Sequence, residues 1–140
     1  MLLACSGGSN VGQLSNQAVL ELGREGFGKM FCLAGIGGRL SGFVQSAKDV
    51  PFLVAVDGCS VGCARAILDN ARIVPHRYVV ITELGIDKSY SFDLERGHID
   101  LVKDSVRVGN SRDSGASGRA GNCCGSGGAA KDSEGSATDG

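Results

Sequence analysis

Residues 52–71, with the sequence FLVAVDGCSVGCARAILDNA, contain the signals of a strand, a glycine turn and a helix in immediate succession. The first five residues are apolar without alternation, which is typical of a strand covered on both faces. Apolar residues then recur at Ala64, Ile67, Leu68 and Ala71, the i, i+3, i+4, i+7 spacing of an amphipathic helix. A buried strand that leads directly into a helix is half of a parallel βαβ unit, so this stretch predicts an α/β fold.

The same alternation extends in both directions along the chain. Short apolar runs at residues 2–5, 30–33 and 78–82 predict three more strands. An Asp93 cap predicts a last helix that runs to about residue 106. Two further helices are expected from apolar stripes at Val11, Leu14, Ala18 and Leu22, and at Leu40, Phe43, Val44 and Ala47. We therefore expect an open, mostly parallel four-stranded sheet with helices on both faces, in the Rossmann-like or flavodoxin-like three-layer arrangement.

The composition excludes several classes of partner. The chain carries 14 basic and 15 acidic side chains, and the basic residues are scattered, so we expect neither nucleic acid nor an anionic membrane as a partner. The sequence has no apolar window of about 18 residues, the length that a membrane helix needs. We expect a soluble cytoplasmic protein. In a reducing compartment, six cysteines indicate metal or thiol chemistry rather than disulfides.

The composition changes at residue 109. From 109 to 140, 20 of the 32 residues are Gly, Ser or Ala, and large apolar residues are absent, so we expect a flexible, disordered C-terminal tail after a folding unit of residues 1–108. Cys123 and Cys124 fall in this tail. They are either a mobile pair of soft ligands or an incidental part of a low-complexity end, and the sequence leaves their role open.

Three cysteines recur at a fixed period. Cys5, Cys32 and Cys59 are separated by 27 residues each time, about the length of one strand, one helix and their loops, and each closes a predicted strand. Parallel strands end at one edge of the sheet, so the period predicts three thiols at that edge. Cys63 follows Cys59 by four residues and is expected on the same face of the third helix. Soft thiolates select zinc, copper(I) or iron–sulfur clusters over calcium and magnesium.

Strand spacing sets a condition on such a site. A tetrahedral zinc ion holds its sulfur ligands roughly 3.8 Å apart, whereas strands two places apart in a sheet are separated by about 9.6 Å. If the first strand lies between the second and the third, Cys5 takes the central position. The glycine turns then allow Cys32 and Cys59 to lean towards it.

Four segments together resemble the DGC-domain family, which is named for its central Asp-Gly-Cys. They are CSGGSN at 5–10, CLAG at 32–35, DGCSVGC at 57–63 and TELG at 82–85, and the likeness covers nearly all of residues 1–108. Members of that family are thought to chelate zinc through two pairs of cysteines. The resemblance implies Zn²⁺ as the cofactor and Cys5, Cys32, Cys59 and Cys63 as its ligands, and it implies no reaction.

The leading hypothesis is a zinc-binding protein that handles or senses the metal through these four cysteines. An alternative is a thiol-dependent redox or sulfur-transfer enzyme, in which Cys59 attacks sulfur and Cys63 or Cys5 resolves the product. An iron–sulfur protein is the second alternative, because iron also accepts four thiolates. Whether the protein is an enzyme stays open. Gly35, Gly37 and Asp57 match part of a dinucleotide-binding fingerprint, but Leu40 stands where its third glycine belongs.

Overall fold

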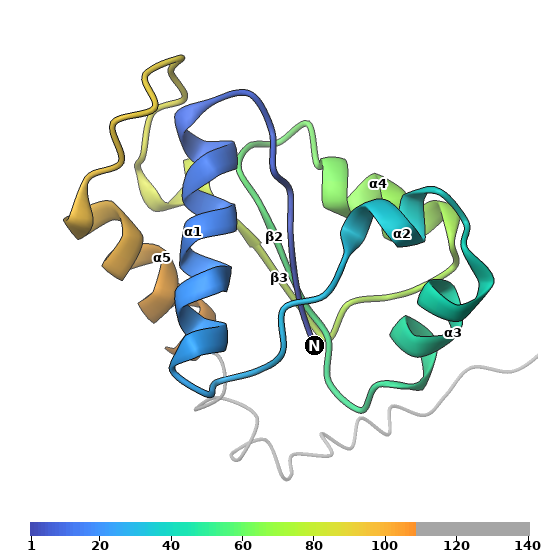
Figure 1. Ribbon diagram of the computed structural model, residues 1–140. Coiled ribbons are helices and arrows are strands. Elements are labelled where there is room, and N and C mark those ends of the chain that lie inside the picture. The colour runs from blue at the N-terminus through green and yellow to red at the C-terminus, as the bar shows by residue number, and fades with distance from the viewer. Residues whose placement is uncertain (109–140) are drawn as a thin grey trace, which may run out of the picture.

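A short parallel sheet runs through the middle of residues 1–108, the part of the chain that the computed structural model describes (Figure 1). Its strands are β1 (Leu2–Ala4), β2 (Val54–Asp57) and β3 (Arg77–Val80), hydrogen-bonded in the order β1-β2-β3. All residues of β1 and β2 are buried, which explains why both strands are apolar on their two faces. The expected α/β class and the parallel sheet are confirmed. The predicted tail at 109–140 lies outside the described residues.

Residues 30–33 do not form the predicted fourth strand. Met30 makes a single parallel bridge to Leu2, in which the N–H of Leu2 donates to the carbonyl of Lys29 at 2.8 Å and the N–H of Phe31 donates to the carbonyl of Leu2 at 2.9 Å. The chain then enters helix α2 (Leu33–Gly37). The helix takes the backbone groups that would have extended a strand, so the described residues hold a sheet of three strands. The bridge lies beside β1, on the side away from β2.

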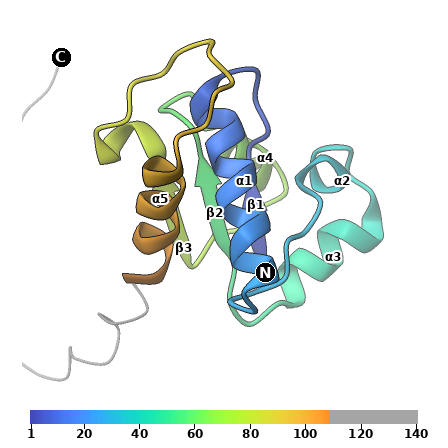
Figure 2. The same ribbon diagram turned by 60° about the vertical axis from the view of Figure 1, so that its left-hand side comes forward.

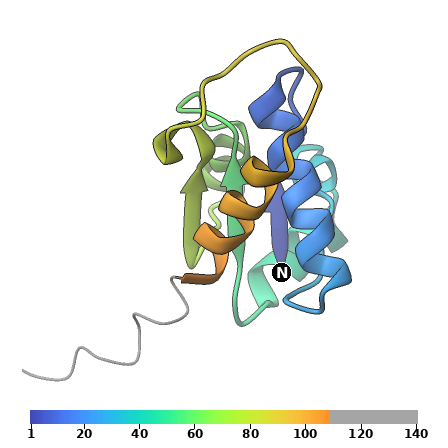
Figure 3. The ribbon, with the colours of Figure 1, turned by 90° about the vertical axis from the view of Figure 1, so that its left-hand side faces the viewer.

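Two helices cover one face of the sheet, α1 (Asn10–Arg24) and α5 (Arg96–Val108), which lie side by side in Figures 2 and 3. The expected stripe of α1 is confirmed, because its four residues are at most 1% exposed. The N-cap is Ser9, whose hydroxyl accepts the N–H of Gly12 at 3.2 Å. Helix α5 supplies the other half of this core through Ile99, Val102 and Val106.

Three short helices cover the opposite face, α2, α3 (Ser41–Asp49) and α4 (Cys63–Asn70) (Figure 1). A Cβ atom on Gly35 would lie 2.4 Å from the ring of Phe43, so α2 and α3 can pack this closely only because residue 35 is a glycine. The core of this face contains Leu3, Ile36, Ala47, Leu53, Ala55, Leu68 and Ile73.

Several boundaries differ from those expected. The strand predicted at 78–82 ends at Val80, where the chain enters the short helix η1 (Ile81–Leu84). Helix α5 begins at Arg96 rather than after Asp93. Within residues 1–108, no helix combines the length and the apolar character required to cross a membrane.

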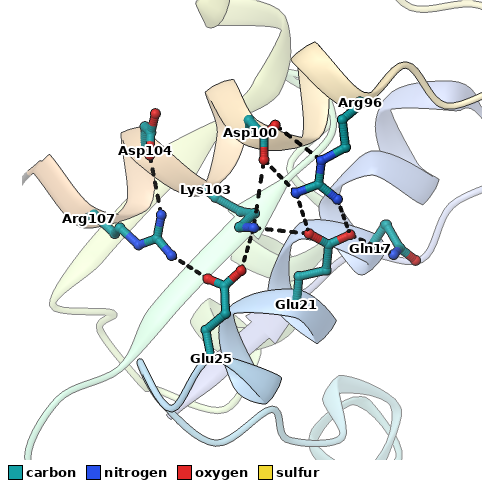
Figure 4. Close-up of polar contacts among 8 residues, drawn as sticks. All are labelled: Gln17, Glu21, Glu25, Arg96, Asp100, Lys103, Asp104 and Arg107. Atoms are coloured by element: carbon teal, nitrogen blue, oxygen red, sulfur yellow. Dashed lines mark hydrogen bonds and ion pairs between the residues drawn. The ribbon is translucent and has the colours of Figure 1, made fainter.

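A network of charged side chains joins α1 to α5 (Figure 4). The ammonium of Lys103, only 5% exposed, lies 3.0 Å from a carboxylate oxygen of Glu21 and 2.6 Å from one of Glu25. Arg96 also contacts Glu21, at 2.9 Å. Hydrogen bonds to the Glu21 carboxylate lower its pKa to about 2. The largest effect is that of Gln17, followed by those of Arg96 and Lys103. These contacts fix the position of α5 along α1.

Candidate functional site

Three of the four predicted metal ligands line one pocket at the carboxyl end of β1. The pocket has a volume of about 450 Å³ and is lined by Cys5, Cys32 and Cys63. Its other walls are mostly apolar and include Met30, Phe31, Leu33, Ala34 and Ile67. Cys5 follows β1, Cys32 is the N-cap of α2 and Cys63 is the first residue of α4, so the pocket depends on the packing of these three elements.

Cys5 is the buried member of this set, with 7% of its surface exposed. Its Sγ accepts the backbone N–H of Gly58 at 3.0 Å and lies 3.4 Å from the hydroxyl oxygen of Ser15. Burial raises the pKa of the Cys5 thiol and outweighs these two contacts, which act in the opposite direction. The thiol form is therefore favoured, while the N–H of Gly58 is in place to stabilise a thiolate.

Cys32 and Cys63 are both exposed, and each stands at the start of a helix. Cys32 is the N-cap of α2, and its Sγ accepts the N–H of Gly35 at 3.4 Å. Cys63 is the first residue of α4. Two of the pocket thiols are thus accessible to solvent, and the third is enclosed.

Cys59 is not among the residues that line the pocket. It lies in a turn before α4, in which the N–H of Gly62 donates to the carbonyl of Cys59 at 3.1 Å, and its Sγ is 3.6 Å from the ammonium of Lys88. The prediction that Cys59 and Cys63 share one helical face is wrong, because Gly62, with φ of 66°, separates the turn from the helix.

The four cysteines do not form a ready metal site. Among residues 1–108, no group of three or more His, Cys, Asp or Glu side chains lies close enough together to hold a metal ion. The structure thus brings Cys5, Cys32 and Cys63 to one pocket, whereas the 27-residue period had predicted Cys5, Cys32 and Cys59 together at the sheet edge.

Asp57 is a structural residue whose role the sequence analysis missed. Its fully buried carboxylate accepts the N–H of Ala64 at 2.8 Å and the N–H of Arg65 at 3.0 Å, and it accepts the hydroxyl of Tyr78 at 3.0 Å. The N-cap position of α4 is Gly62, which has no side chain, so Asp57 supplies the cap from the end of β2. This use of the carboxylate leaves the dinucleotide-binding interpretation without its acidic residue.

Gly58 allows two parts of the chain to approach closely. A Cβ atom there would lie 2.8 Å from the backbone of Val11 and Gly12, at the start of α1. The same residue donates its N–H to Cys5. The Asp-Gly-Cys stretch thus combines a helix cap, a tight backbone contact and a thiol beside Lys88.

Asn10 fixes the segment that carries Lys88. Its side-chain amide donates to the carbonyl of Asp87 at 2.8 Å, and its side-chain oxygen accepts the N–H of Ser89 at 2.6 Å. Figure 3 shows this segment passing over the first turn of α1. The sequence offered no signal for the contact, because the partners are more than seventy residues apart.

Comparison with known proteins agrees with the resemblance seen in the four motifs. Residues 1–106 match the DGC domain family. "Anaerobic and virulence modulator AnvM" from Pseudomonas aeruginosa is 37% identical over 95 residues, which cover 68% of this chain and 72% of that protein. No solved structure matches the chain significantly. Because the family match spans residues 1–106 and this relative is 37% identical, the chain belongs to the DGC domain family.

Proposed function

We propose that the protein binds a soft metal through thiolates at the pocket and that it handles or senses this metal. The supporting observation is that Cys5, Cys32 and Cys63, from three separate elements, line one pocket. An inert role as small apolar residues would explain the buried Cys5 but not the two exposed cysteines beside it.

The chemistry of the lining favours soft metals. Its possible ligands include three thiols and the thioether of Met30, and the lining contains no His, Asp or Glu. Thiolates and thioethers prefer zinc, copper(I) and iron–sulfur centres. The N–H groups of Gly58 and Gly35, which already donate to two of the sulfurs, would offset the charge of the thiolates.

Zinc held by all four cysteines is the most specific form of this proposal. The side-chain positions described above do not meet that geometry, because Cys59 lies beside Lys88 and outside the pocket. For four thiolates to meet, Cys59 has to enter the pocket, and Cys5, Cys32 and Cys63 have to approach one another. Cys59 is partly buried and packs against the core of the α1 face, so its movement has to break these contacts, while Ser60 and Val61 of the same turn are exposed.

Sensing fits the relative better than catalysis does. The name of the Pseudomonas protein describes a modulator and mentions no reaction. We place the function in the cytoplasm, where thiols stay reduced, with a metal ion rather than a nucleic acid or a membrane as the partner.

Metal titration of the full chain under reducing, anaerobic conditions tests the proposal. The background variant carries Cys123→Ser and Cys124→Ser, so that binding is assigned to residues 1–108. We expect about one zinc equivalent per chain, measured by elemental analysis and chelator competition, and weaker binding after Cys32→Ala or Cys63→Ala. Metal content near zero with every thiophilic metal tried would contradict the proposal.

Thiol chemistry at Cys59 is a second candidate, favoured by the 3.6 Å contact between its Sγ and the ammonium of Lys88. In this reaction the Cys59 thiolate bonds to one sulfur of a disulfide substrate, and the other sulfur leaves as a thiolate. Thiol titration is expected to find one fast cysteine, which Cys59→Ser removes and Lys88→Gln slows. Equal rates for Cys59 and for the exposed Cys63 would exclude this candidate.

A further inference from the structure

The pocket beside β1 has walls that the binding of a metal ion does not require. Most of its lining is apolar, and none of the described residues that line it is Asp, Glu, Lys, Arg or His. Its volume of about 450 Å³ is within the range of about 300–1,000 Å³ typical of pockets for small organic molecules. These walls therefore match an uncharged, mostly apolar molecule better than a charged one, whose burial would be costly.

Residues 30–34 form one wall of the pocket, because all five line it. Cys32 lies in the middle of this wall, between Phe31 and Leu33, and is exposed. The N–H of Gly35 donates to its sulfur at 3.4 Å. A backbone N–H in this position offsets the negative charge of a thiolate, which is the nucleophilic form of cysteine. The wall thus contains an accessible nucleophile among apolar side chains.

Phe31 gives the same wall an aromatic surface next to Cys32. Its ring packs against that of Phe43 in α3, with the ring centroids 5.4 Å apart and the planes inclined by 45°. Phe31 is only partly buried and lines the pocket, so this ring pair is held at the edge of the cavity. Aromatic rings attract one another in stacked and edge-to-face arrangements, so a planar ring in the pocket gains from contact with Phe31.

We propose that the pocket binds a small uncharged quinone and that the thiol of Cys32 adds to it. A quinone combines the properties that these walls favour: it has no charge, its ring is planar, and its ring carbons accept a thiolate. The inference goes beyond the proposed function and does not depend on a bound metal.

The addition needs no further reactant. The sulfur of Cys32 supplies the electron pair of a new bond to a ring carbon that carries hydrogen. The thiol proton goes to one quinone oxygen, and the hydrogen of that ring carbon goes to the other oxygen as a proton. The product is a hydroquinone joined to cysteine through a thioether. No group leaves, and no outside oxidant or reductant takes part.

The other two thiols of the pocket are less well placed for this reaction. Cys5 is only 7% exposed. Cys63 is exposed, but its neighbour in the lining is Ile67, which follows four residues later on the same face of α4. The aromatic residue of the wall is adjacent in the chain to Cys32, so a ring seated against Phe31 is expected to react there.

Anaerobic reaction with a methylated naphthoquinone tests the inference. The full chain, with Cys123→Ser and Cys124→Ser, is reduced and freed of metal with a chelator before the quinone is added. We expect one adduct per chain, assigned to Cys32 by peptide mass spectrometry. The rate should level off at high quinone concentration, because the quinone occupies the pocket before it reacts. Cys32→Ala should abolish the adduct, and Cys63→Ala should retain it.

A variant of the aromatic wall separates binding from thiol reactivity. Phe31→Leu removes the ring but keeps an apolar side chain, so the quinone should bind about two- to tenfold more weakly while the labelling of Cys32 by iodoacetamide stays unchanged. The matched control is Phe27→Leu, because Phe27 is also partly buried but packs against the core of the α1 face, outside the pocket. Circular dichroism checks that both variants are folded.

Each contrary result has a distinct meaning. A rate that rises linearly with quinone concentration, or equal labelling of Cys59, would overturn the inference, because any accessible thiol would then suffice. An adduct that survives Cys32→Ala and is lost in Cys63→Ala would overturn the assignment to Cys32. Failure of the quinone to react leaves metal binding standing, and metal content near zero leaves the quinone adduct standing, so the two proposals fail separately.

Discussion

Tyr78 donates its hydroxyl proton to the buried carboxylate of Asp57 across 3.0 Å, which joins β3 to the carboxyl end of β2. Burial, and then this hydrogen bond, raises the pKa of the Tyr78 hydroxyl well above its ordinary value. The carboxylate also accepts two N–H groups of α4. One side chain thus holds two strands and a helix together at the edge that carries the cysteines.

Removal of this carboxylate should destabilise the fold. Asp57→Ala leaves two helix N–H groups and the Tyr78 hydroxyl without an acceptor, and we expect a loss of about 2 kcal/mol or more in the free energy of unfolding. Asp57→Asn keeps one acceptor oxygen and should lose less. Urea denaturation measures both. The matched control is Asp69→Ala on α4, the helix that Asp57 caps. The Asp69 side chain is 59% exposed, so we expect its removal to change the free energy of unfolding by less than about 0.5 kcal/mol. Equal effects at the two positions would contradict the role of Asp57.

Replacement of Gly58 should disturb the junction between β2 and α1. The Cβ atom of Gly58→Ala would lie 2.8 Å from backbone atoms, which cannot give way as a flexible side chain can, so we expect a loss of roughly 1–3 kcal/mol. Gly97→Ala is the control, because no atom lies within 4 Å of its added Cβ and α5 gains a better helix former, worth up to about 1 kcal/mol. Thermal unfolding compares the two variants, and a neutral Gly58→Ala would show that this contact is not tight.

Acid should weaken the contact between α1 and α5. The pKa of Glu21 is about 2 in the folded chain against an ordinary value of 4.5, so the folded state favours the charged form. Its contribution to stability is fully present above the ordinary value and is lost as pH falls from 4.5 towards 2. Urea unfolding as a function of pH should show this slope.

Glu21→Gln should reduce the slope without abolishing it, because Arg96 also lowers the pKa of Asp100. The control, Glu95→Gln, replaces a carboxylate that is 75% exposed and should keep the parent slope. An unchanged slope in Glu21→Gln would refute the assignment to Glu21.

The pocket thiols should differ in reactivity before any metal is added. Cys5 is buried and its pKa is raised, so alkylation by iodoacetamide at neutral pH should be at least about tenfold slower there than at the exposed Cys32 and Cys63. Peptide mass spectrometry resolves each site, and unfolding in urea should remove the difference. Rapid labelling of Cys5 in the folded chain would show that this side of the pocket opens.

The sequence predicted helix α1 from its periodic apolar stripe and strand β2 from its continuous apolar run. Residues 30–33 are as apolar as a buried strand, but the structure that so short a run adopts depends on local contacts. Here Cys32 caps helix α2, and the chain enters that helix instead of extending the sheet. Periodicity cannot detect a helix as short as Leu33–Gly37.

The site could be predicted only in part, for a similar reason. Cys5 follows strand β1, as the period predicted, but Cys32 reaches the same pocket as the N-cap of α2 rather than at the end of a strand. The position of Cys59 depends on Gly62 and on Lys88, which Asn10 holds in place through contacts distant in sequence. A linear pattern contains no information about such contacts, so the separation of Cys59 from the pocket was not foreseen.

Adjacent residues at the end of β2 have two distinct duties, since Asp57 anchors α4 and the N–H of Gly58 contacts the sulfur of Cys5. The peptide bond between these two residues therefore connects the contact to the enclosed thiol with the contact to the start of α4. Because residues 57 and 58 share this peptide bond, we expect a ligand bound to the Cys5 sulfur to alter the hydrogen bonds at the start of α4 as well.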